Sequence, residues 1–237
     1  MLTCGKYEHR LISVSYLEFV GRHLKTGGLP DLVNNDVGLI KGINMNWRNL
    51  DVQMQPFSAR LTSELKLTPE VVTKLGTTIA SDVRFLSPEM KTEIRTASPV
   101  PLEDRLAELQ AFQGWMDQAN AVRNNPFVTR AQVLSQNYIC FVYLPEACFR
   151  VLAKACPAGS AAKKCSQFLS NNPVRAYRNA VAHANWTYRA DFGGIIYWAR
   201  KGSDPNEALE RFEVEQADLS FWQALSRCVA YAAFSNL

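Results

Sequence analysis

The sequence predicts a mainly α protein: a bundle of four to five helices with a small β-hairpin or extended insertion before the last helix. Three observations carry this prediction. From residue 102 onward, apolar residues recur at intervals of three and four, as they do on one face of a helix. Between residues 193 and 214 the period changes, and β-branched and aromatic residues flank a turn region with glycine and proline. Helical spacing returns at about Asp218 and continues toward the C-terminus.

The first hundred residues contain fewer clear signals. Residues 8–25 have a helical pattern, whereas residues 26–67 are rich in Gly, Asn and Asp and favour turns, short strands or an irregular surface. Thr68 and Pro69 are good cap and first-turn residues and open a second helix. The apolar side of this helix is formed by Val71, Val72, Leu75, Ile79 and Val83.

A proline-rich turn at residues 96–101 marks the predicted boundary between residues 1–98, a partly helical segment without an assigned role, and a helical domain over residues 99–237. The apolar positions of the first helix of that domain are Leu102, Leu106, Leu109, Phe112, Trp115 and Met116. The following elements are predicted as helices over 127–156 (kinked near Pro145), 158–169 and 173–186, extended segments over 193–200 and 209–214, and a last helix from Asp218.

The composition is that of an ordinary soluble globular protein, with 47% hydrophobic and 20% charged residues among 237. The sequence contains neither a run of eighteen apolar residues nor a secretory signal pattern at its start, so we expect a cytoplasmic protein without a membrane span. Six cysteines are present, and none forms a CxxC pair. We therefore expect small apolar side chains in helices rather than a metal site or disulfides.

The charge distribution is uneven even though the net charge is only +4. Residues 147–190 contain no Asp or Glu. Such a segment favours a positive surface that attracts polyanions, and the alternative is a basic face that merely contacts water. The positive charges of this acid-free run are Arg150, Lys154, Lys163, Lys164, Arg175, Arg178 and Arg189.

The segment from Arg175 to Trp186 places arginines, asparagines and a histidine on about three predicted helical turns. The chain has three histidines, and His183 is the one that lies among arginines. An imidazole that exchanges protons near neutral pH beside a guanidinium that holds an anion suits metal-independent cleavage of an RNA phosphodiester. The alternative is that Arg178 and His183 are solvated or hydrogen-bonded helix residues without a catalytic role.

The sequence Arg178-Asn179-Ala180-Val181-Ala182-His183 fits the R-x4-H motif and resembles the HEPN family, whose motif also lies on a late helix of a bundle. The resemblance covers residues 100 to 237. It implies a HEPN-like bundle and a metal-independent, cofactor-free endoribonuclease whose site forms between the two chains of a homodimer and leaves a 2′,3′-cyclic phosphate. It also implies that Arg178 holds the scissile phosphate, Asn179 orients it and His183 acts as acid and base. Ala184 stands where relatives often carry glycine.

The positions around the predicted helix add RNA contacts at Arg175 and Asn185, and the positive run adds Lys163 and Lys164. We expect a toxin or antiviral defence effector that a separate protein inhibits. Two alternatives stay open: a non-catalytic HEPN-type module that binds RNA or a partner protein, and a helical scaffold.

Overall fold

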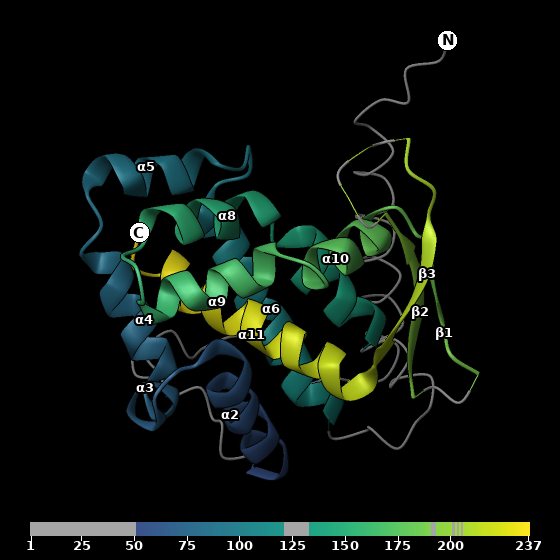
Figure 1. Cartoon of the computed structure of the whole chain (residues 1–237). Helices are drawn as coiled ribbons and strands as arrows, with labels where there is room; N and C mark the ends of the chain where they lie inside the picture. The colour runs from purple at the N-terminus through teal and green to yellow at the C-terminus, as the bar shows by residue number, and fades with distance from the viewer. Residues whose placement is uncertain (1–50, 121–132, 191–192, 201, 203, 205) are drawn as a thin grey trace. The chain divides into compact units, whose positions relative to one another are not determined.

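The computed structural model describes residues 51–120, 133–190, 193–200, 202, 204 and 206–237. The chain divides into two compact units, residues 1–46 and 47–237, and every described residue belongs to the second. As predicted, this unit is mainly helical and carries a small antiparallel sheet (Figure 1). The helix predicted over residues 8–25 lies outside the described residues.

The segment before residue 99 contains more helix than the sequence predicted. Helix α2 (Asp51–Leu65) occupies a region predicted as turns or irregular structure. Its Phe57, Leu61 and Leu65 recur every four residues and pack into the core, and this packing outweighs the poor local helix signal. The other helices of this segment are α3 (Pro69–Thr73), α4 (Leu75–Arg84) and α5 (Pro88–Thr96).

The helix predicted to open at Thr68 is split at Lys74 into α3 and α4. The predicted cap is confirmed, because the Thr68 hydroxyl accepts a hydrogen bond from the Val71 amide at 3.5 Å. Ser87 caps α5 in the same way, with its hydroxyl 3.3 Å from the Met90 amide.

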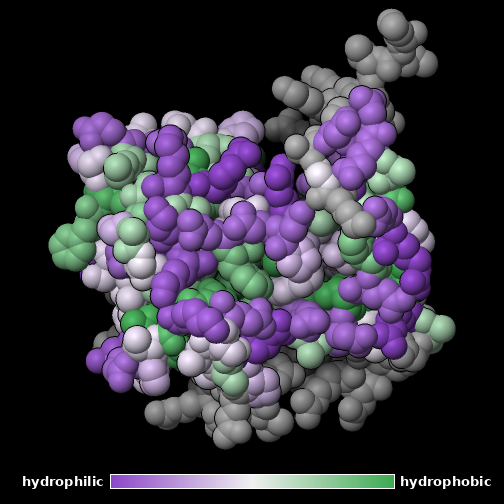
Figure 2. Space-filling view, in the orientation of Figure 1, coloured by the Kyte–Doolittle hydropathy of each residue, from purple (hydrophilic) through white to green (hydrophobic). Residues whose placement is uncertain are grey.

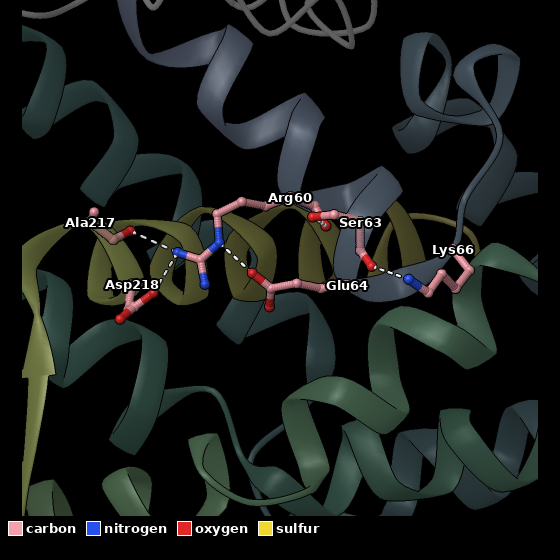
Figure 3. Close-up of polar contacts among 6 residues, drawn as sticks. All are labelled: Arg60, Ser63, Glu64, Lys66, Ala217 and Asp218. Carbon is pink, nitrogen blue, oxygen red and sulfur yellow. Dashed lines mark hydrogen bonds and ion pairs between the residues drawn. The ribbon is translucent and has the colours of Figure 1, made fainter.

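Helix α2 is joined to the last helix, α11 (Gln216–Phe234), by the Arg60 guanidinium. Figure 3 shows it reaching the Ala217 carbonyl at 3.2 Å and the Asp218 carboxylate at 2.8 Å. The guanidinium carbon also lies 4.3 Å from the centre of the Phe221 ring. Further along, α4 packs against α9 (Ala161–Ser170) and α11, and α5 packs against α8 (Glu146–Ala155). The core is therefore continuous across residues 98 and 99.

Helix α6 (Leu102–Asn120) forms where the sequence predicted it. The long helix predicted over residues 127–156 is instead interrupted. A π-helical turn, η2 (Ile139–Tyr143), is followed by the non-helical residues Leu144 and Pro145, and α8 begins at Glu146. Leu144 is extended, with φ −78° and ψ 108°. Pro145 accounts for the break, because it has no amide hydrogen and disfavours helical geometry in the residue before it.

Helix α10 (Val174–Ala182) carries the predicted motif but is shorter than predicted. It ends where Ala184 adopts a positive φ of 56°. The Asn185 amide donates to the Ala180 carbonyl at 2.8 Å, and the Ala184 amide donates to the Val181 carbonyl at 3.2 Å. These bonds form a Schellman motif, which terminates a helix and normally places glycine at the position of Ala184.

The predicted hairpin is confirmed as β2 (Gly194–Ala199) paired with β3 (Glu210–Glu215). A strand that the sequence did not predict, β1 (Trp186–Tyr188), pairs with the other edge of β2, which gives the order β1-β2-β3. Trp186 is therefore a strand residue opposite Tyr197, not the end of the preceding helix. Gly194 has no room for a side chain, since a Cβ there would lie 2.3 Å from the Val214 carbonyl oxygen.

The interior beneath α10 is aromatic and contains free thiols. The Tyr177 ring lies 5.1 Å from Phe141, 5.2 Å from Tyr197 and 5.7 Å from Trp222, measured between ring centres.

In the described part of the chain, none of the helices combines the length and apolar character needed to cross a membrane. The cysteines of that part are buried and free, as expected for apolar side chains: Cys140, Cys148, Cys156, Cys165 and Cys228.

Candidate functional site

Arg178, the first residue of the predicted motif, points into the protein. The residue is only 4% exposed. Its Nη1 donates a hydrogen bond to the carbonyl of Leu144, the residue that follows the last turn of η2. The guanidinium carbon lies 5.2 Å from the centre of the Phe149 ring and 5.8 Å from that of Phe141. Both distances fit a cation held against aromatic faces.

The surroundings of Arg178 make its charge unfavourable but do not remove it. Burial lowers the pKa of Arg178 to about 10, and the nearby Glu146 carboxylate acts in the opposite direction. The guanidinium therefore stays protonated at neutral pH. Its Nε and Nη2 have no hydrogen-bond partner within the described part of the chain. In a single chain, an RNA phosphate cannot reach this group unless the side chain leaves the interior.

Asn179 and His183, the other residues of the motif, are exposed. His183 is the C-cap of α10, and its amide donates to the Asn179 carbonyl at 3.1 Å. Positions 178 and 183 lie about 140° apart around a helix. The structure thus places the arginine in the interior and the histidine in solvent, and it does not bring them to one surface of this chain.

Arg175, one turn before Arg178, faces outward, with 46% of its side chain exposed. Its Nε lies 3.6 Å from the Glu146 carboxylate on α8, too long for a tight ion pair. It borders a cavity of about 380 Å³ formed by α8, α9 and the start of α10. Figure 2 shows hydrophilic side chains over α8 and α9 on this face. The charged and polar residues of the lining that matter below are Glu146, Arg150, Lys154, Ser170, Asn171 and Arg175.

The cations of this cavity differ in how they are paired. Lys154 Nζ lies 3.3 Å from the Glu93 carboxylate of α5. Arg150 is exposed and has no ion pair within the described part of the chain. The Ser170 hydroxyl is shielded from solvent and has no hydrogen-bond partner among the described residues. The cavity therefore offers two exposed arginines, Arg150 without an ion pair in the part of the chain that is described and Arg175 with only a long contact to Glu146.

The remaining predicted RNA contacts have other neighbours. Lys163 Nζ donates to the Cys156 carbonyl at 3.3 Å, and Lys164 Nζ donates to the Lys66 carbonyl at 2.8 Å. Neither lines the cavity. Asn185 is half-buried, and its carbonyl accepts from the Trp198 amide at 2.9 Å, which ties the end of α10 to β2.

Sequence reasoning included Arg150 and Lys154 in the positive run but did not place them at a site, and it overlooked Glu146. The signal that could have found them is their spacing. Residues 146, 150 and 154 follow one another at four-residue intervals, which places them on one face of α8. That Arg175 of α10 lies against this face could not be predicted without the fold.

Comparisons of this chain with protein-family models, with curated proteins and with solved structures found no match. The site must therefore be interpreted from its own chemistry. Over the described ranges, no three side chains of His, Cys, Asp or Glu lie close enough together to hold a metal ion.

Proposed function

We propose that this chain is a HEPN-type helical module that binds RNA phosphates through the exposed cations of α8 and α10. One observation carries the proposal: Arg150, Lys154 and Arg175 come from two helices and border a single cavity whose lining includes one carboxylate, Glu146, while Glu93 of α5 pairs with Lys154 from outside the lining. Guanidinium groups form paired hydrogen bonds with phosphate oxygens, and clustered cations gain further affinity by releasing counterions from RNA.

The burial of Arg178 supports the binding version of the HEPN resemblance over the catalytic version. Catalysis as the family motif implies would need this guanidinium on the scissile phosphate, whereas binding needs only the cations that are already exposed. The second version requires no rearrangement of the chain. RNA binding is therefore the function that this geometry favours.

Binding can be tested with a fluorescent single-stranded RNA titrated at several salt concentrations. We expect the affinity to fall as salt rises, and we expect Arg175→Glu together with Arg150→Glu to weaken binding by at least about tenfold and to reduce the salt dependence. Lys74→Glu together with Arg84→Glu is the matched control, because it makes the same charge change at two exposed residues that do not line the cavity. Salt-independent retention, or equal losses in both proteins, would contradict the proposal.

A second candidate function, RNA cleavage without a metal, is favoured by the exposure of His183 and Asn179 at the end of α10. An imidazole in water is suited to proton transfer at neutral pH. A single His183 cannot readily serve as both base and acid, so this candidate function requires a homodimer in which a two-fold axis brings two copies of His183 to one phosphate. It also requires Arg178 to turn outward in that dimer.

Cleavage is tested by incubating RNA with the protein and a chelator and by analysing the ends for 2′,3′-cyclic phosphate. If the candidate function holds, His183→Ala abolishes cleavage and leaves RNA affinity unchanged. Wild-type protein that binds RNA but leaves it intact, or cleavage that survives His183→Ala, would exclude it and would leave the binding proposal standing.

A further inference from the structure

We propose that the cavity between α8, α9 and α10 binds a terminal phosphate, either the 5′-phosphate of an RNA or the phosphate of a free mononucleotide. This inference deepens the proposed function, and its RNA version rests on it. It is drawn from the charge, the shape and the hydrogen-bonding groups of the cavity.

The charge of the lining favours an anion that carries more than one negative charge. Three cations, Arg150, Lys154 and Arg175, face one carboxylate, Glu146. Because Glu93 approaches Lys154 from α5, the two arginines supply most of the remaining positive charge. A terminal phosphate carries nearly two negative charges at pH 7, whereas an internal phosphodiester carries one. The lining therefore attracts a chain end more strongly than the middle of an RNA.

The start of α10 adds to this preference. Helix α10 has no acidic residue in its first turn and no side-chain cap. Asn171 and Arg175, which flank this helix end, both line the cavity. The Arg175 amide already donates to the Asn171 carbonyl at 2.9 Å, so the contribution of this helix end is that of its dipole, which adds to the field of the arginines.

The cavity is open to solvent, so it can admit a phosphate together with an attached sugar. About 380 Å³ falls at the lower end of the range of small-molecule sites, and it is more than a phosphate ion alone fills. The exposed side-chain amide of Asn171 supplies a donor and an acceptor in addition to the arginines. A phosphate bonded to Arg150 and Arg175 would leave room for the attached sugar.

The long contact between Arg175 and Glu146 allows a phosphate to bind the Arg175 guanidinium in place of the carboxylate. At 3.6 Å the Nε and the carboxylate oxygen do not form a short hydrogen bond. A phosphate that forms paired hydrogen bonds with the Arg175 guanidinium therefore replaces a weak contact rather than a strong one. Glu146 also repels the incoming anion, so it lowers the affinity of the cavity.

The test compares two RNAs of one sequence, one with a 5′-phosphate and one with a 5′-hydroxyl, together with adenosine monophosphate and inorganic phosphate as small probes. We expect wild-type protein to bind the 5′-phosphorylated RNA about tenfold more tightly, since one charge-assisted contact is worth at least this factor. We expect Arg150→Gln and Arg175→Gln each to reduce the preference to less than about threefold. Lys163→Gln is the control, since it removes a charge of the same run outside the cavity.

The small probes identify the source of the phosphate. Adenosine monophosphate that binds as tightly as the phosphorylated RNA, and that loses affinity in Arg150→Gln, assigns the cavity to free nucleotides. Much weaker binding of the nucleotide, with the 5′-phosphate preference retained, assigns it to RNA ends. Both outcomes support the terminal-phosphate site.

Two outcomes overturn it. If wild-type protein binds both RNAs equally and does not bind the nucleotide, the inference fails while the proposed RNA binding stands. If Lys163→Gln removes the preference as fully as Arg150→Gln, the effect is one of diffuse charge and the cavity has no special role. Conversely, nucleotide binding without any RNA binding would refute the proposed function and retain the site. Both arginines are exposed, so circular dichroism is expected to show folded variants in every case.

Discussion

Arg175 and Arg178 lie three residues apart on α10, yet they occupy opposite environments. Arg175 extends over a cavity lined by other cations, whereas Arg178 lies against Phe149 and donates to a buried carbonyl. Two residues of one type on one helix therefore have different chemistry, because the fold gives one of them solvent and the other an aromatic interior. Membership of the motif therefore does not make a guanidinium accessible: Arg178 belongs to the motif and is buried, whereas Arg175 lies outside it and is exposed.

The largest expected effect comes from truncating the buried arginine. Arg178→Ala should lower the free energy of unfolding by about 2–4 kcal/mol, because it leaves a cavity beside Phe149 and frees the Leu144 carbonyl from its partner. Arg178→Met keeps the length of the side chain and removes a poorly solvated charge, so we expect a change within about 1 kcal/mol. Urea unfolding of both variants measures the difference. Equal losses would show that the charge of Arg178, and not its volume, stabilises the interior.

Glu146 connects the two environments, since it contacts Arg175 and acts on the charge of Arg178. Glu146→Gln should destabilise the fold by about 1 kcal/mol because Arg178 loses an opposite charge. The same change should strengthen binding of adenosine monophosphate about threefold because it removes repulsion from the cavity. Thermal unfolding and nucleotide titration on one preparation measure both effects. Weaker nucleotide binding would show that Glu146 positions Arg175 rather than opposing the ligand.

Ala184 tests how firmly the end of α10 holds His183. Its positive φ of 56° is costly for any residue with a Cβ. Relief of this strain in Ala184→Gly should stabilise the protein by about 0.5–1 kcal/mol. The larger conformational entropy of glycine in the unfolded chain offsets part of that gain. Chemical denaturation would detect the gain. A clear loss of stability would contradict the Schellman geometry assigned to this end.

The smallest effect concerns the thiols around Arg178. Burial raises the pKa of Cys148 to about 11, above the usual value near 9. A pKa raised by folding contributes stability that is present below pH 9 and is lost as the pH rises from 9 toward 11. We expect almost no change in stability between pH 7 and 8.5, and we expect Cys148 to resist alkylation over that range. Peptide mass spectrometry after labelling locates the reactive thiols, and rapid labelling of Cys148 would show that this interior admits water.

The sequence predicted those elements whose signals are local. Caps such as Thr68, the hairpin with Gly202 in its turn, and the helical periodicity of the last third all depend on near neighbours and are present in the structure. Helix α2 was missed because it is stabilised by contacts with α11, far along the chain: Phe57 packs on Phe221, and Arg60 binds Ala217 and Asp218. The break at Leu144 was predicted only as a kink, although Pro145 marks its position.

The site shows the same division. Arg175, Asn179 and His183 follow one another at four-residue intervals, so helical spacing alone places them on one face, and all three are exposed. The burial of Arg178 did not, because a long charged side chain reaches the interior only if partners are there, and these are supplied by η2 and α8. Tertiary contact decides the environment of such a residue.

The most direct measurement compares the RNA affinities of Arg175→Gln and Arg178→Met, each shown to be folded, against wild type at one salt concentration. If exposure decides which arginine binds phosphate, Arg175→Gln weakens binding by about fivefold or more and Arg178→Met changes it by less than about twofold. The opposite result, with affinity lost in Arg178→Met and kept in Arg175→Gln, would contradict the account by showing that the inner guanidinium reaches the RNA.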